Sequence, residues 1–380
     1  MGLLLATVAL VASLFQPQDA APTRRLAAAQ AQPQTLYASP TGTIAAFAQD
    51  GPLLAWFAPS AKHCNSVRLL SLSIGGGVVL PDESPGALNV TCQWDVVPPV
   101  RLALAGTSAI WTLHDKLSPL PFDYLLGAGS HDRRERRFKE ITHGARGAGL
   151  WFGGIAGDST ADGTSLVVGV TAIAYTDELA CLSKGSCALD VASTGGGVYR
   201  IVGRSEPILV PGTKSAIAVA VSGTSVASIP AGSVGPDGRP EPSAGLPVEI
   251  RDVGSGTVLA TIVPGATPIA LALTPGVLAL LEQVKSGLHL AWYDTATGAL
   301  RGDVPVPADT SPELTANDQE IVFRVGRSIR AASVATRAIR TLTKAASTPI
   351  GLSLDGTRLA WAENVDGRGR IRALVLSGKG

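Results

Sequence analysis

Residues 349–364 read PIGLSLDGTRLAWAEN and decide the fold. An apolar strand ends at the turn Asp355-Gly356, and a second apolar strand follows directly, which is the pattern of a β-hairpin. The same order of strand, turn and strand recurs five times more, and once in a degenerate form. The clear copies begin at Thr43, Val100, Ala216, Pro268 and Pro312, and the degenerate copy begins at Gly149. The chain is therefore built from a repeated hairpin.

A second pair of strands follows most of these hairpins. After the copy at Pro268, for example, His289–Asp294 and Ala299–Val304 both have the pattern of strands. Four strands in a unit of roughly forty residues are the signature of a propeller blade. Runs such as Ile269–Leu273 are apolar without alternation, which indicates sheets covered on both faces. We therefore predict an all-β fold, a seven-bladed β-propeller with four-stranded antiparallel blades, and keep six or eight blades as alternatives.

The two ends of the repeat region complement each other. The last unit ends one strand short, after Arg370–Leu376, whereas Gln34–Ala38 precedes the first hairpin without a partner of its own. We expect this N-terminal strand to complete the last blade and close the ring, because an open sheet edge invites aggregation. Residues 32–380 then form a single propeller domain.

Two motifs resemble those of known propeller families. Residues Leu352–Trp361 resemble the repeat of TolB-type, WD40-like propellers, whose core reads S-P-D-G-x-x-[IL]-[AV]-[FW], with Leu354 in place of the proline. Tyr293–Gly298 is similar to the D-x-x-T-G turn of YVTN and quinoprotein propellers. That turn is found once and lacks the tryptophan that follows it in quinoproteins, so quinone binding is not carried over. The resemblance implies an extracytoplasmic interaction module.

The N-terminus and the cysteines indicate export. Leu3–Phe15 is an apolar stretch too short to span a bilayer comfortably, so we interpret residues 1–31 as an export signal, with a buried N-terminal helix as the alternative. The cysteines are Cys64, Cys92, Cys181 and Cys187. An even number behind an export signal favours disulfides, with pairing between neighbours in the sequence preferred and four reduced thiols as the alternative. We expect a secreted, periplasmic or cell-envelope protein.

Composition excludes several classes of partner and chemistry. The 31 basic and 30 acidic residues give a net charge of +1, so the chain has no basic field for binding nucleic acid. No further run is long and apolar enough for a transmembrane helix. The cysteines lack zinc-site spacing, and the chain has no G-x-S-x-G nucleophile motif. We therefore expect a monomer without a cofactor, a bound metal or a recognisable catalytic motif.

The candidate binding residues lie near the ends of the second strands. The connections between the second and third strands of all blades share one face of a propeller, around the central funnel. The candidates are Trp111, His114, Asp115, Glu282, Glu363 and Asn364. The simpler interpretation is solvated loop residues with a tryptophan covering the core.

Three hypotheses about function follow. The first is a non-enzymatic module that binds a protein or an envelope glycan on this face. The second is a propeller hydrolase or lyase that uses Asp115, Glu282 and Glu363, because glycosidases need two carboxyl groups at a set separation. The third is a purely structural module.

Overall fold

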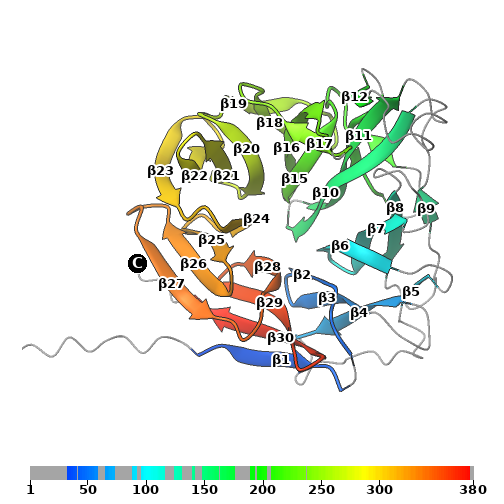
Figure 1. Ribbon diagram of the computed structural model, residues 1–380, viewed down its shortest axis with the longest axis vertical. Helices are drawn as coiled ribbons and strands as arrows, with labels where there is room; N and C mark the ends of the chain where they lie inside the picture. The colour runs from blue at the N-terminus through cyan, green and yellow to red at the C-terminus, as the bar shows by residue number, and fades with distance from the viewer. Residues whose placement is uncertain are drawn as a thin grey trace, which may run out of the picture. The chain divides into compact units, whose positions relative to one another are not determined.

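The computed structural model describes residues 32–40, 42–58, 65–72, 88–91, 96–115, 124–130, 139–141, 148–161, 163–175, 189–192, 195–202, 207–236 and 238–376. Within these ranges the regular secondary structure consists of strands, which form seven antiparallel sheets (Figure 1). The expected export signal and all four cysteines lie outside the described residues. The described part of the chain contains no helix long and apolar enough to cross a membrane.

Four sheets each contain four consecutive strands. Their strands are β2 (Ala46–Asp50), β3 (Leu53–Ala58), β4 (Asn65–Ser71) and β5 (Leu88–Thr91); β6 (Val96–Ala105), β7 (Ser108–Asp115), β8 (Tyr124–Ser130) and β9 (Lys139–Ile141); β20 (Thr267–Leu273), β21 (Val277–Val284), β22 (Gly287–Asp294) and β23 (Leu300–Val306); and β24 (Thr310–Ala316), β25 (Glu320–Val325), β26 (Ser328–Ser333) and β27 (Ile339–Lys344). In each sheet the strand order equals the chain order, as expected for a propeller blade.

The other three sheets add a strand to this plan or reorder it. One has the order β10-β11-β13-β14 with β12 beside β11, the next has β15-β16-β18-β19 with β17 beside β16, and the last has β28-β29-β30-β1. Their strands are β10 (Ala148–Thr160), β11 (Gly163–Tyr175), β12 (Leu189–Val191), β13 (Gly197–Arg200) and β14 (Ile208–Leu209); β15 (Ala216–Ser222), β16 (Ser225–Val234), β17 (Pro240–Pro242), β18 (Val248–Asp252) and β19 (Val258–Ile262); and β28 (Ile350–Asp355), β29 (Arg358–Val365), β30 (Arg368–Val375) and β1 (Gln34–Ala38).

The first strand of each hairpin repeat lies innermost. These strands contact one another in the order β2, β6, β10, β15, β20, β24 and β28, and β28 contacts β2 again. Figure 1 shows the sheets arranged around a common centre. The prediction of an all-β propeller with four-stranded antiparallel blades is confirmed.

Strand β1 pairs with β30 at the outer edge of the last sheet. The register places Gln34 opposite Ala373 and Ala38 opposite Arg370. Beyond the strand, the Arg372 guanidinium donates a hydrogen bond of 2.6 Å to the carbonyl oxygen of Pro33. Both described ends of the chain therefore lie in one sheet.

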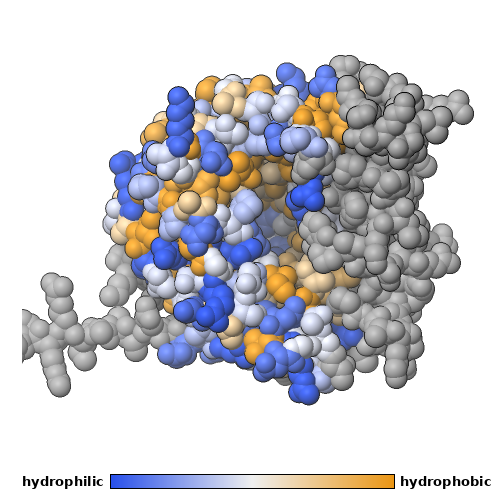
Figure 2. Space-filling view, viewed as in Figure 1, coloured by the Kyte–Doolittle hydropathy of each residue, from blue (hydrophilic) through white to orange (hydrophobic). Residues whose placement is uncertain are grey.

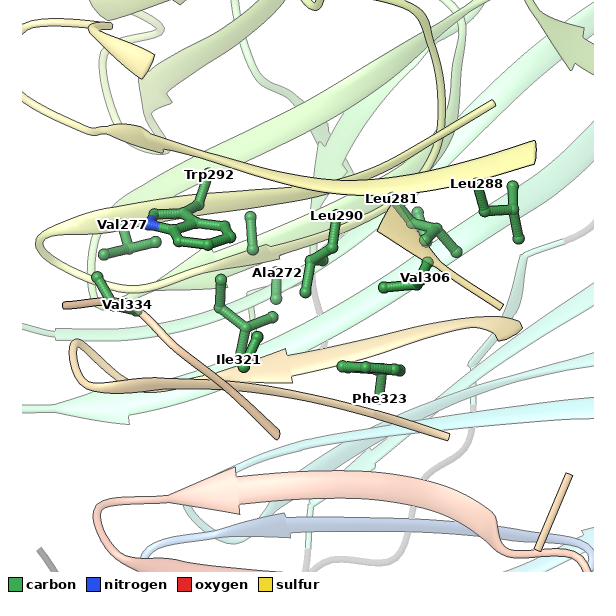
Figure 3. Packing of buried hydrophobic residues seen from close by; sticks show 13 residues of the cluster. Ala272, Val277, Leu281, Leu288, Leu290, Trp292, Val306, Ile321, Phe323 and Val334 are labelled. Carbon is green, nitrogen blue, oxygen red and sulfur yellow. The ribbon is translucent and has the colours of Figure 1, made fainter. Parts of the chain in front are cut away.

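The hydrophobic core lies between the faces of neighbouring sheets. Figure 3 shows this packing between the β20–β23 and β24–β27 sheets, where Trp292, Leu290, Ile321 and Phe323 are fully buried. The first six residues of β21 are buried without alternation, because both faces of the sheet are covered. Truncating a side chain such as Phe323 to alanine costs about 3–5 kcal/mol in cores of this kind.

The hydrogen bonds of the D-x-x-T-G turn occur in three sheets, although the sequence motif itself occurs once. In Asp294–Gly298 the Asp294 carboxylate accepts the Thr297 amide at 2.9 Å, and the Gly298 amide bonds to the Asp294 carbonyl at 2.8 Å. Asp252–Gly256 and Ser333–Arg337 have the same hydrogen bonds and end on a residue with positive φ. The sequences of these two turns differ from the motif. Serine replaces threonine in the first turn, and in the second turn serine replaces aspartate and arginine replaces glycine.

Candidate functional site

A cavity of about 430 Å³ lies at the centre of the sheets. It is lined by the C-terminal halves of the seven innermost strands and by the turns that follow several of them. Figure 2 shows the surface hollowed at this centre. We call its polar rim the channel mouth. The channel mouth consists of Gln49, Asp50, Asp158, Thr160, Ser222, Thr274, Asn317, Asp318 and Asp355.

The channel mouth is acidic. Most innermost strands are mainly apolar in their C-terminal halves, and several reach an aspartate or another polar residue where the chain turns back into the second strand. Among the described residues that line the cavity, four are aspartates and none is Lys, Arg or His. The four are Asp50, Asp158, Asp318 and Asp355. One arginine lies just behind them, since Arg358 is 3.3 Å from the Asp355 carboxylate.

Asp50 and Asp158 connect neighbouring sheets. The two oxygens of Asp50 accept the backbone amides of Gly106, at 2.5 Å, and Ser159, at 3.2 Å. Asp158 accepts the amide of Gly223 at 2.6 Å. Gly106 and Gly223 lie in turns of the adjacent sheet, whereas Ser159 lies in β10, one sheet further round from β2. The two carboxylates therefore connect different sheets as well as lining the cavity.

The remaining bonds of this kind lie on the other side of the ring. Asp318 accepts the hydroxyl of Thr274 at 2.5 Å and the amide of Gly276 at 3.0 Å, which connects the β24–β27 sheet to the β20–β23 sheet. Asn317 donates a bond of 2.8 Å to the carbonyl oxygen of Gly356 in the last sheet. Gln49 donates a bond of 2.8 Å to the carbonyl oxygen of Ser353.

Burial raises the pKa of Asp50 above its ordinary value. The side chain is only 7% exposed, so its charged form loses hydration. The amides of Gly106 and Ser159 oppose this shift, whereas the nearby charges of Asp158 and Asp355 add to it. A positive charge bound in the channel mouth would therefore relieve the repulsion of Asp50 by Asp158 and Asp355.

The residues predicted from sequence lie elsewhere. Trp111 is buried in the core between the β2–β5 and β6–β9 sheets. His114 and Asp115 lie in β7, paired with Val97 and Val96; their side chains lie outside the described part.

Glu282 is buried at the opposite end of β20 and β21 from the channel mouth, where it pairs with Pro268. It accepts the amide of Ala266 at 3.0 Å and the hydroxyl of Tyr293 at 2.9 Å. Burial raises the pKa of Glu282, partly offset by the bond from Tyr293. The carboxylate thus fixes the segment that leads into an innermost strand.

Glu363 and Asn364 act in the same way at that end of the last sheet. Glu363 is 2% exposed, accepts the amide of Ala346 at 2.8 Å and lies 2.6 Å from the guanidinium of Arg370. Asn364 accepts the amide of Ile44 at 2.8 Å and donates to its carbonyl at 2.9 Å.

Of the predicted residues, Trp111, Glu282, Glu363 and Asn364 have described side chains, and none of these four lines the cavity. A binding role for them stays a prediction. The residues that do line the channel mouth had a signal in the sequence, because Asp50 and Asp355 each precede a turn glycine. That signal indicated turns only, since the hairpin pattern does not show which side chains face the centre.

The described residues contain no group of three or more His, Cys, Asp or Glu side chains arranged to hold a metal ion. Asp50, Asp158 and Asp318 each accept a backbone amide from another sheet, and Asp355 lies beside Arg358.

No protein-family model matches the chain. No curated protein matches it either. Among solved structures, a chain of the Mitotic Checkpoint Complex has a TM-score of 0.49 at 13% identity and covers 98% of this chain and 100% of its own. Sqt1 from Saccharomyces cerevisiae has a TM-score of 0.45 at 9% identity, covering 90% and 99%. BamB from Moraxella catarrhalis has 0.42 at 11%, covering 87% and 85%. These likenesses assign no function to the chain.

Proposed function

We propose that the chain is a non-enzymatic interaction module, a seven-bladed ring closed by β1, which binds a partner protein by holding a lysine or arginine of that partner in the channel mouth. The observation that carries the proposal is the described lining of the central cavity, in which four residues are aspartates and none is basic. Its volume of about 430 Å³ falls in the range of ordinary ligand pockets.

The electrostatics favour a cation over an anionic glycan. A lysine or arginine side chain would form charge-assisted hydrogen bonds with the aspartates, and such bonds are roughly twice as strong as neutral ones. An acidic envelope glycan would meet repulsion from the same groups. The hydrolase alternative gains no support from Glu282 and Glu363, because both are buried away from the cavity and bonded within their own sheets.

A peptide library displayed on phage tests the proposal. Peptides selected on the wild-type protein should be enriched in lysine or arginine, and the double variant Asp158→Asn with Asp355→Asn should bind them at least roughly tenfold more weakly. Asp309→Asn with Asp366→Asn removes the same charge from exposed positions and serves as the control. Selected peptides without basic residues, or equal loss in both double variants, would refute the proposal.

Closure by β1 has a separate test. Deleting Gln34–Ser39 should lower the melting temperature, because β30 loses its antiparallel partner and the buried ring of Tyr37 leaves Trp56, whose ring centroid lies 4.5 Å away. An unchanged melting temperature would show that the ring does not depend on this strand.

We also propose that the module acts outside the cytoplasm. The apolar stretch Leu3–Phe15 supports export, and export supports disulfides among the cysteines. Fractionation of the native host, with N-terminal sequencing of the mature protein, tests both. Recovery of the uncleaved chain from the cytosol would contradict the proposal.

A further inference from the structure

A groove of about 330 Å³ opens between the β15–β19 and β20–β23 sheets, beside the channel mouth. It shares five lining residues with the central cavity, so the two form one continuous depression. The shared residues are Thr160, Ser222, Leu273, Thr274 and Pro275. A ligand held in the channel mouth can therefore extend into the groove without leaving the surface.

The groove opens where the hydrogen bonds between turns are interrupted. The turn after β15 is tied backwards, since the Gly223 amide bonds to Asp158 of the preceding sheet. The turn after β20 is tied forwards, since Thr274 and the Gly276 amide bond to Asp318 of the following sheet. Among the described residues, no hydrogen bond joins these two turns to each other. The gap between them is the groove.

The groove is uncharged and amphipathic. The lining residues that the structure describes include no Asp, Glu, Lys, Arg or His, in contrast to the channel mouth. Leu259 contributes a large apolar side chain that is 50% exposed, and Ile250 and Leu273 lie beside it. Ser222 and Thr224 bring hydroxyl groups that can bond to the amides of an extended chain.

We infer that the groove holds an aliphatic side chain of the same partner segment whose lysine or arginine enters the channel mouth, an inference that rests on the proposed function. The ligand is then an extended protein segment with an aliphatic residue at a fixed distance from a basic one. The aspartates supply attraction for the charge, and the groove selects the neighbouring residue by burying apolar surface. Leu259 is the specificity-determining residue.

A library of peptides with one fixed lysine and randomised flanking positions tests the inference. On the wild-type protein, selection should enrich Leu, Ile or Val at one offset from the lysine. Leu259→Lys places a charge in the groove and should abolish that enrichment, weakening the selected peptides roughly tenfold. Leu300→Lys is the matched control, because Leu300 is a 58% exposed apolar residue on β23 that does not line the groove.

The outcomes separate the two proposals. Binding of lysine peptides without an aliphatic preference, or a preference unchanged in Leu259→Lys, overturns the groove and leaves the channel mouth standing. Loss of selection for lysine itself, measured with fully randomised peptides, overturns the proposed function. Binding of maltotriose or chitotriose in place of any peptide, lost in Leu259→Lys but kept in Leu300→Lys, would show that the groove belongs to a neutral glycan and overturn the inference.

Discussion

The two ends of the innermost strands use carboxylates in opposite ways. At the channel mouth, Asp158 and Asp355 line an open cavity. Asp158 connects two sheets through the Gly223 amide, whereas Asp355 lies 3.3 Å from Arg358 of its own hairpin. At the other end, Glu282 and Glu363 are buried under the segments that lead into β20 and β28. Asp158 and Asp355 can accept further hydrogen bonds from a ligand, whereas Glu282 and Glu363 use their hydrogen bonds within the fold. A carboxylate beside a propeller funnel is therefore not by itself a binding group.

Among the substitutions that compare the two ends, Glu363→Ala should have the largest effect on stability. The substitution leaves the amides of Ala346 and Ser347 and the guanidinium of Arg370 without their acceptor in a buried place. We expect the free energy of unfolding to fall by about 2–4 kcal/mol in a urea titration. Glu363→Gln keeps one acceptor and should lose less. A loss below about 0.5 kcal/mol for the alanine variant would break the contrast between the two ends.

Asn364→Asp should have the next largest effect. The carboxylate would face the carbonyl oxygen of Ile44, to which the asparagine now donates at 2.9 Å. We expect the free energy of unfolding to fall by about 1–3 kcal/mol, because two hydrogen-bond acceptors, the new carboxylate and the Ile44 carbonyl, then face each other in a partly buried place. Asn364→Ser, which can still donate, is the comparison. Equal stability of the aspartate variant and the wild type would mean that this pair of bonds does not hold β2 in place.

Asp158→Asn should barely change stability. The amide oxygen of asparagine can accept the Gly223 amide as the carboxylate does, so the free energy of unfolding should change by less than about 1 kcal/mol. Binding of a basic peptide should nevertheless weaken. A variant that unfolds as readily as Glu363→Ala would place Asp158 in the same class as the buried glutamates.

The smallest effect is the pH dependence of Glu282→Gln. The pKa of Glu282 lies above its ordinary value of 4.5 because the group is buried. A group with a raised pKa contributes its full stabilisation below pH 4.5 and loses it as the pH rises through the folded-state pKa. The wild type should therefore lose more stability than Glu282→Gln between pH 4.5 and 7, measured by thermal unfolding at both values. Parallel curves would contradict the shift.

The repeat could be predicted from the sequence because it depends on local chemistry. Turn residues such as Asp355-Gly356 and unbroken apolar runs such as Ile269–Leu273 identify each hairpin without knowledge of its neighbours. The turn at Ser333–Arg337 does not match the D-x-x-T-G motif, because different side chains form the same hydrogen bonds there.

The site could not be predicted because it depends on which ends of the strands meet. Glu282 and Asp50 both stand near the end of a strand in the sequence, yet one is covered by its own sheet and the other borders the cavity. The groove lies where, among the described residues, no hydrogen bond joins the turns after β15 and β20. A sequence pattern within one hairpin does not show whether two distant turns are bonded to each other. Only the arrangement of all seven innermost strands reveals it.

The pairing of β1 with β30 determines the order in which strands of this protein can pair during synthesis. Arg372 and Pro33 are joined by a hydrogen bond across 339 positions of the chain. During synthesis the first strand must wait, exposed and unpaired, until the last strand has left the ribosome. Blades in between can form earlier, whereas the ring that we propose is completed only in the final step. A nascent chain stopped before β30 therefore keeps β1 without its pairing partner, and an unpaired strand edge is open to aggregation.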